Sequence, residues 1–404
     1  MQPNSRNVAI LFFTLVVVMM GFGMVIPIFP FYVTAFGAGG SELGLLMAIF
    51  AIMQFIFAPI WGQLSDRVGR KPLLLLGVTG NAISLLLFGL STQLWMLFAA
   101  RALGGILSSA TMPTAMAFIG DSTSEENRGG GMGVMGAAMG VGMVVGPGLG
   151  GWLADTSLSL PFFVGSGLSV LALILIYLIL PESLPPAHRE STTGRVKGPQ
   201  IGQLWQALLG PLGFLLFMAF LVSFALTNFE GIFGLYALDR FGYGAQRVGT
   251  IMMVVGLIGA IVQGGLTGPL TRRFGEATMI KASLLGSAIG FALMLTATTF
   301  ATVLLTVGFF VLCNSMLRPA VSSLTSRKAT MGQGAAMGLN NSFMSLGRII
   351  GPIWAGAIFD VNLHYPYITG AIIMAIGFIV AMRWLASGEG VKGGRGEGVK
   401  ASAG

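Results

Sequence analysis

The stretch GQLSDRVGRKPLLLL occupies residues 62–76, and GPLTRRFGEA occupies residues 268–277. In each stretch, a short charged segment lies next to apolar residues. The two stretches begin 206 residues apart in the sequence. A second set of glycines and prolines recurs at an offset of 205. Such an offset, maintained across several segments, indicates a duplicated structural unit. The recurring positions are Gly62, Leu64, Arg67, Gly69, Gly142, Gly146, Pro147, Gly151 and Asp155, matched by Gly268, Leu270, Arg273, Gly275, Gly347, Gly351, Pro352, Gly356 and Asp360.

The composition indicates a membrane protein. Of 404 residues, 54% are hydrophobic and 9% are charged, with a mean hydropathy of +0.85. Soluble domains carry about 25% charged residues, so the deficit of charge is decisive. The 61 glycines suit helices that pack closely in a bilayer. Cys313 is the only cysteine, which excludes an intrachain disulfide.

Twelve apolar segments are long enough to cross a bilayer as helices. The longest loop between them, residues 181–210, divides the segments six and six. We therefore predict an all-α membrane protein with an N-terminal half (1–180), a linker (181–210), a C-terminal half (211–386) and a disordered, low-complexity tail (387–404). The predicted spans are residues 8–33, 43–64, 73–91, 94–118, 129–154, 161–180, 211–237, 246–270, 279–298, 301–324, 333–359 and 366–386.

The distribution of basic residues predicts the orientation. An even number of spans places both termini on one side, and 17 Lys and Arg residues lie in the termini and loops of that side. The opposite loops contain only Arg240 and Arg247. By the positive-inside rule, both termini are cytoplasmic. The net charge of +8 thus reflects membrane topology, and we expect the lipid bilayer rather than nucleic acid as a partner.

Three motifs resemble those of the major facilitator superfamily. They are the loop at residues 62–76, RALGG in the fourth predicted span (Arg101–Gly105), and GMVVGPGLGG in the fifth (Gly142–Gly151), which resembles the motif of the antiporter branch. FALTNFEGIFGLYALDRFGY and LNNSFMSLGRIIGPIWAGAIFD look like the NorA and Bmr group of bacterial multidrug–proton antiporters. The resemblance implies a monomeric exporter of amphipathic drugs in the bacterial inner membrane. It also implies that the protein is not an enzyme and uses the proton as its coupling ion, without a cofactor or metal.

Glu230 is an acidic residue deep inside a predicted span, whereas the other acids lie in loops, at span ends or in the tail. A charge at mid-membrane costs roughly 2.5–3.5 kcal/mol on the insertion scale, so such a residue is a functional candidate. We predict that Glu230 binds the transported proton, as the essential carboxylate of the NorA-like group does. Arg101 is predicted to bias the protonation of a carboxylate. The alternatives are a hydrogen-bonded neutral Glu230 and an Arg101 that snorkels to the surface.

The substrate site is predicted to be cationic. In the NorA-like group a second acid precedes the Arg of the RPA motif by three residues, and here that position is Ser315. Arg348 stands mid-span where the NorA-like proteins have a neutral residue; the alternative is a structural ion pair of Arg348 with Glu230. One carboxylate against two or three arginines predicts a preference for neutral, zwitterionic or anionic amphiphiles. Methionine and aromatic side chains suit varied ligand shapes, although each candidate is as compatible with core or lipid-facing packing. The predicted substrate-binding residues are Phe22, Gln54, Met112, Met139, Met143, Phe229, Glu230, Phe233, Met252, Asn340 and Arg348.

The charged loop and the glycine stripe are predicted to control conformation. Asp66 can face a helix N-terminus or a nearby Arg, although basic loops can also serve orientation alone. Glycines four residues apart allow close helix contact, and a proline kinks the helix. In this family the stripe marks exporters, although it also suits ordinary packing. The predicted residues are Gly62, Asp66, Arg67, Gly69, Arg70, Lys71, Arg101, Gly142, Gly146, Pro147, Gly150 and Gly151.

Proton-coupled export of amphipathic drugs is therefore the expected function. One alternative is a narrow exporter, for tetracyclines or sugars, that uses the same machinery. Another is a receptor or an uncoupled facilitator, which would not need Glu230 or the glycine stripe. ATP is excluded as the energy source because no GxxxxGK[ST] motif is visible.

Overall fold

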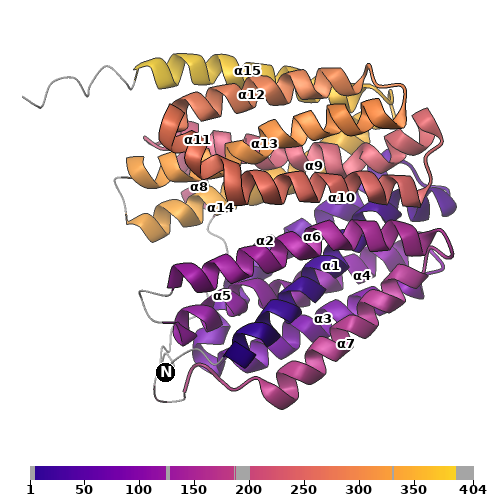
Figure 1. Cartoon of the computed structure of the whole chain (residues 1–404), viewed down its shortest axis with the longest axis vertical. Helices are drawn as coiled ribbons and strands as arrows, with labels where there is room; N and C mark the ends of the chain where they lie inside the picture. The colour runs from indigo at the N-terminus through magenta and orange to yellow at the C-terminus, as the bar shows by residue number, and fades with distance from the viewer. Residues whose placement is uncertain (1–4, 124–127, 186, 188–200, 330–331, 388–404) are drawn as a thin grey trace, which may run out of the picture.

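The computed structural model describes residues 5–123, 128–185, 187, 201–329 and 332–387. Within these residues, twelve helical spans are long and apolar enough to cross a membrane, which confirms the predicted fold class. They form two bundles, coloured indigo to magenta and pink to yellow in Figure 1. The first bundle consists of α1 (Ser5–Ala35), α2 (Gly40–Val68), α3 (Arg70–Gly89), α4 (Leu94–Leu107), the 3₁₀ turn η1 (Ser108–Ala110), α5 (Thr111–Ser122), α6 (Arg128–Ala154) and α7 (Leu160–Ile179).

The second bundle begins after a short helix in the linker. The predicted linker thus contains helix α8, and the predicted disordered tail lies outside the described residues except for Ser387. The elements are α8 (Ile201–Leu208), α9 (Gly213–Phe241), α10 (Ala245–Ile261), the π-helical segment η3 (Val262–Leu266), α11 (Thr267–Phe274), α12 (Glu276–Met294), α13 (Phe300–Lys328), α14 (Gln333–Phe359) and α15 (Tyr365–Ser387).

Several helices extend beyond the apolar segments from which they were predicted, because their polar ends continue the same hydrogen-bonded turns. Helix α2 ends at Val68 rather than near residue 64. Gly69, with a φ of 115°, then both ends α2 and precedes α3. Gly275, with a φ of 77°, does the same between α11 and α12. Only glycine adopts these positive φ angles without strain, which explains why the two positions recur in the repeat.

The two ends of the bundle differ in how the halves meet. We call the end with the turns at Gly69 and Gly275 the basic face, and the end with the turns at Gly37 and Gly242 the opposite face. The halves pack through α2 with α14 and through α6 with α10, with smaller contacts of α1 with α9 and α10. At the basic face, the main packing partners of α5 and α11 in the described chain lie within their own halves. The halves meet at the opposite face, where Gly40 of α2 approaches Gly356 of α14 and Gly151 of α6 approaches Ala245 of α10, so the protein is closed at that face.

Candidate functional site

Glu230 lies on α9, the helix most enclosed by its neighbours. Most of α9 is buried, including Asn228, Phe229 and Gly231. Leu226, Thr227 and Glu230 are partly exposed, and their spacing of three and four residues places them on one face of the helix. Among the described residues Glu230 has no hydrogen bond and no ion pair within 4.0 Å. Its carboxyl group is therefore accessible from one side and not committed to a partner.

Arg348 on α14 is the cation whose charge acts on Glu230. The same guanidinium is also under the influence of Arg318 on α13. Arg348 is partly exposed and Arg318 is exposed. Helices α9, α13 and α14 of the C-terminal half thus place one carboxyl group and two guanidinium groups in a chain of electrostatic interactions. Arg348 interacts with both Glu230 and Arg318. This arrangement can accept a proton at Glu230 and an anionic or dipolar group beside the arginines.

Arg101 on α4 is buried in a different setting. Its guanidinium carbon lies 5.5, 4.9 and 4.4 Å from the ring centroids of Phe22, Phe29 and Phe50. Its Nε has no hydrogen-bond partner in the described chain. The rings stabilise the cation by cation–π contact. In this state Arg101 therefore belongs to an aromatic cluster of the N-terminal half, and it makes no ion pair with a carboxylate of the described residues.

The predicted substrate-binding residues fall into two groups. The rings of Phe229 and Phe233 pack in a tilted arrangement, with a centroid separation of 5.0 Å, in the buried core of the C-terminal half. Met252 and Asn340 are also buried, and the Nδ2 of Asn340 donates to Ser322 Oγ at 3.3 Å. The buried group can act on a ligand only after a rearrangement. The partly exposed group comprises Phe22, Gln54, Met112, Met139, Met143, Glu230 and Arg348.

The charged loop at the basic face forms a network inside the N-terminal half. Arg70 pairs with Asp66 at 2.5 Å and with Asp121 at the end of α5 at 2.9 Å. The backbone N–H groups of Arg70 and Lys71 donate to the Glu182 carboxylate after α7, at 2.8 and 3.2 Å. Asp66 thus faces a nearby Arg, one of the two partners considered from the sequence. These contacts hold four elements together at this face: α2, α3, α5 and the segment after α7.

The repeat contains the same contact with its charges exchanged. Arg70 and Asp121 correspond, at the offset of 206, to Glu276 and Arg327. Glu276 accepts from Arg327 Nη1 at 2.8 Å. Sequence reasoning did not identify this second pair, although the repeat offset provides the signal for it.

The glycine stripe of α6 serves two interfaces. A Cβ at Gly142 or Gly150 would lie within 2.8 Å of carbonyl oxygens of α1. A Cβ at Gly151 would instead approach the backbone of α10 in the other half, at 2.5 Å from the Ala245 oxygen. Gly356 of α14 likewise faces Gly40 of α2 across the halves. The stripe thus permits close packing both within a half and between the halves.

A hydrogen-bonded contact between the halves, not predicted from the sequence, closes the opposite face. The Asp360 carboxylate at the end of α14 accepts from the backbone N–H groups of Gly40 and Ser41, at 2.7 and 2.9 Å. It also accepts from the Ser41 hydroxyl. These groups form the first turn of α2, where a carboxylate is favourable. Asp155, the repeat counterpart of Asp360, makes no such bond among the described residues.

The geometry, with two six-helix halves and a charged group between apolar helices, is that of a membrane transporter. The profile of the Major Facilitator Superfamily matches residues 11–331 and, in a second match, 264–402. The chain belongs to this superfamily, and it is a transporter and not an enzyme.

Its relatives include drug-resistance proteins of bacteria. Multidrug resistance protein 1 of Bacillus subtilis is 35% identical over 388 residues, which cover 96% of this chain and 98% of that protein. Quinolone resistance protein NorA of Staphylococcus aureus is 31% identical over 381 residues, covering 93% and 95%.

Solved structures support the fold. The human organic anion transporter MFSD10 matches with a TM-score of 0.69 at 23% identity, over 94% of this chain and 100% of that chain. A bacterial homologue of the human lysosomal transporter Spinster, in an inward-facing conformation, matches with a TM-score of 0.74 at 15% identity, over 93% and 95%.

Proposed function

We propose that this protein exports amphipathic compounds in exchange for protons across the bacterial cytoplasmic membrane, with both termini in the cytoplasm. The observation that carries the proposal is Glu230, a partly accessible carboxyl group inside a span with no bonded partner in the described chain. An intramembrane carboxyl group of this kind is suited to bind and release a proton. The names of the bacterial relatives support drugs as the exported class.

The closed opposite face supports an alternating-access cycle. In the proposed orientation the basic face is cytoplasmic, so the described state receives substrate from the cytoplasm. Substrate binding then leads to opening at the opposite face, where substrate leaves and a proton binds Glu230. Return to the described state releases the proton inside. Each carrier state presents Glu230 to one side only, as exchange requires.

The charges near Glu230 support a particular substrate class. Two positive charges, on Arg348 and Arg318, interact with one carboxyl group, that of Glu230, so the net charge of this group of three is positive when Glu230 is ionised. A lipophilic cation would meet net repulsion there, whereas a zwitterion can place its anionic group at the arginines. We therefore propose neutral, zwitterionic and anionic amphiphiles as the preferred substrates.

Transport in proteoliposomes with an imposed pH gradient tests the coupling. Wild-type protein is expected to accumulate substrate against its gradient, and Glu230→Gln is expected only to equilibrate it, because the amide cannot carry a proton. Asp155→Asn is the matched control, since Asp155 is an exposed acid at the opposite face. A Glu230→Gln protein that still drives uphill transport would place the proton site elsewhere.

A panel of cationic, zwitterionic and neutral drugs tests the breadth of specificity in the same assay. Transport of several chemical classes supports multidrug export. Transport of a single class, such as tetracyclines, would indicate a narrow exporter with the same coupling residue.

A further inference from the structure

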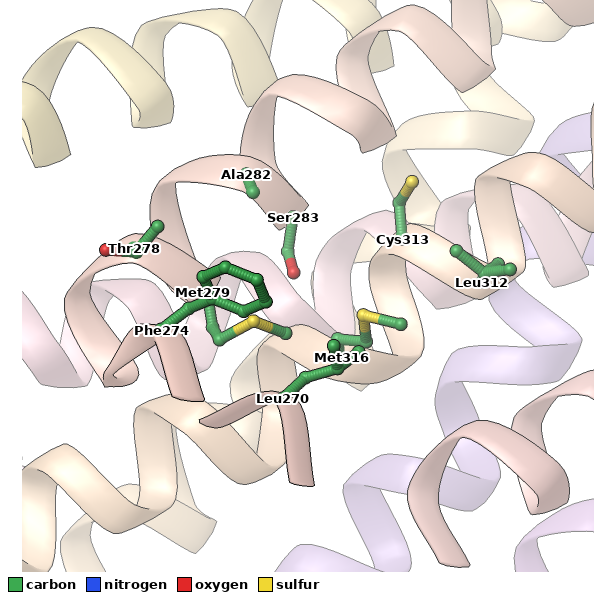
Figure 2. Close-up of a pocket in the computed structure, with 9 residues that line it drawn as sticks. All are labelled: Leu270, Phe274, Thr278, Met279, Ala282, Ser283, Leu312, Cys313 and Met316. Carbon is green, nitrogen blue, oxygen red and sulfur yellow. The ribbon is translucent and has the colours of Figure 1, made fainter. Parts of the chain in front are cut away.

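A cavity of about 380 Å³ lies in the C-terminal half between α11, α12 and α13. Figure 2 shows Ala282 and Ser283 of α12 on one side and Cys313 and Met316 of α13 on the other. None of the residues assigned above to proton or substrate lines this cavity. The lining is almost entirely apolar and consists of Leu270, Phe274, Thr278, Met279, Ala282, Ser283, Leu312, Cys313 and Met316.

The cavity opens toward lipid rather than toward the other half. On α13, Leu305, Phe309 and Leu312 are exposed at helical spacing, so they form one stripe that leads to the cavity. On α12, Leu285 and Ile289 form a second exposed stripe. Large exposed apolar side chains on neighbouring helices of a membrane bundle mark a lipid-facing surface. The cavity is therefore a recess in that surface.

A positive charge lies at the end of the recess nearest the basic face. The exposed guanidinium of Arg273 lies 5.3 Å from the ring centroid of Phe274, which lines the cavity. Thr278, in the first turns of α12, adds an exposed hydroxyl. The nearby acid, Glu276, is engaged by Arg327. An anionic group at this position would therefore meet a cation and the beginning of a helix without a free carboxylate.

We propose that this recess binds a phospholipid with an anionic headgroup from the leaflet at the basic face. One acyl chain fills the cavity between α11, α12 and α13, and the phosphate lies at Arg273. Basic pockets between membrane-spanning helices bind anionic lipid headgroups by this combination of apolar fit and charge. The bound lipid joins α11 to α12 and α13, directly after the π-helical segment η3.

Cys313 provides a direct probe, because it is the only cysteine of the chain and it lines the cavity. The rate of its alkylation by N-ethylmaleimide is measured by intact-protein mass spectrometry on purified protein in detergent. Phosphatidylglycerol or phosphatidylcholine is added at equal mole fraction. We expect alkylation to be at least about five-fold slower with phosphatidylglycerol, since the anionic lipid occupies the recess.

Two variants make the test specific. Arg273→Gln is expected to remove the difference between the lipids, whereas Arg247→Gln, a cation stacked on Tyr243 at the opposite face, is expected to retain it. Ala282→Phe, at the exposed rim of the cavity, is expected to lower by one the number of phosphatidylglycerol molecules retained in native mass spectrometry.

Equal alkylation rates in the two lipids, or an unchanged difference in Arg273→Gln, would overturn the proposal. Protection of Cys313 by an amphipathic drug but not by phosphatidylglycerol would assign the recess to drug instead. None of these measurements depends on transport. The lipid proposal can therefore be disproved while the export proposal stands, and the export proposal can be disproved while the lipid proposal stands.

Discussion

Glu230 and Arg348 interact through their charges without a contact ion pair in the described chain. A buried contact pair would hold the carboxylate in place, and removing either partner would leave an uncompensated charge. In the proposed cycle, the looser arrangement lets Glu230 exchange its proton while the charge of Arg348 acts on nearby groups. The proposal therefore gives the two residues separable roles, coupling for Glu230 and charge selection for Arg348.

Replacing Arg348 with Gln should change substrate preference. Without this cation, repulsion of a lipophilic cation near Glu230 decreases by on the order of 1–2 kcal/mol at an intermediate effective dielectric. We expect the transport ratio of ethidium to a zwitterionic quinolone to rise about tenfold, measured by competition in proteoliposomes. Arg348→Lys keeps the charge and should keep the wild-type ratio. An unchanged ratio in Arg348→Gln would show that the arginine does not select charge.

The sequence singles out Glu230 as a candidate, because a charged side chain inside an apolar run has no local explanation; its role remains a prediction. The environment of Arg101 was not predictable in the same way. Phe29 and Phe50 lie on α1 and α2. The sequence pattern of an apolar helix does not show which residue a particular phenylalanine contacts. The aromatic rings surround the Arg101 guanidinium only because α1, α2 and α4 pack together.

At the scale of elements, α14 is one of the helices that join the halves. Gly347 and Gly351 allow it to pack against α9, and Gly356 allows it to approach α2. Helix α6 repeats this arrangement with α1 and α10. The symmetry ends at the helix termini, where Asp360 caps α2 and its counterpart Asp155 makes no such bond in the described chain. In the described part of the chain, Asp360 therefore gives one interface between the halves a polar contact that Asp155 does not give the other.

Asp360→Ala should weaken closure of the opposite face. Loss of a helix-capping side chain costs about 1 kcal/mol, which corresponds to about a five-fold shift toward the state open at that face. Spin labels at Thr92 and Thr298, exposed positions of the two halves at that face, would report the distance distribution in a Cys313→Ser background. Asp155→Ala is the matched control and should leave the distribution unchanged. A similar shift in both variants would argue against a specific contact at Asp360.

The elements themselves were largely predictable, whereas their contacts were only partly so. Hydropathy located the twelve spans, and it ended several of them early because charged terminal turns lower the local average while remaining helical. The repeat offset contained the exchanged pair of Glu276 and Arg327. The partners of Arg70 in α5 and after α7 required the three-dimensional arrangement, since no sequence pattern relates those segments.

At the scale of the whole molecule, the proposed use of Glu230 as the proton carrier limits the energetics of transport. If Glu230 alone carries the proton, each cycle moves one proton inward. One charge crossing the membrane gains about 2.3 kcal/mol per 100 mV. The charge of the exported substrate then determines how much of that energy can drive export. An outgoing monovalent cation cancels the charge of the incoming proton, so no net charge crosses the membrane.

Exchange of one proton for one substrate molecule makes a sharp prediction about membrane potential. With no pH gradient, a potential of 100 mV, negative inside, should drive a neutral or zwitterionic substrate to a ratio of at most roughly 50-fold. A monovalent anion gains twice the energy, since two charges then move in the favourable direction, and a monovalent cation gains none. Proteoliposomes with a potassium diffusion potential would measure these ratios. Potential-driven accumulation of a monovalent cation would require more than one proton per cycle, and hence a second proton-binding residue besides Glu230.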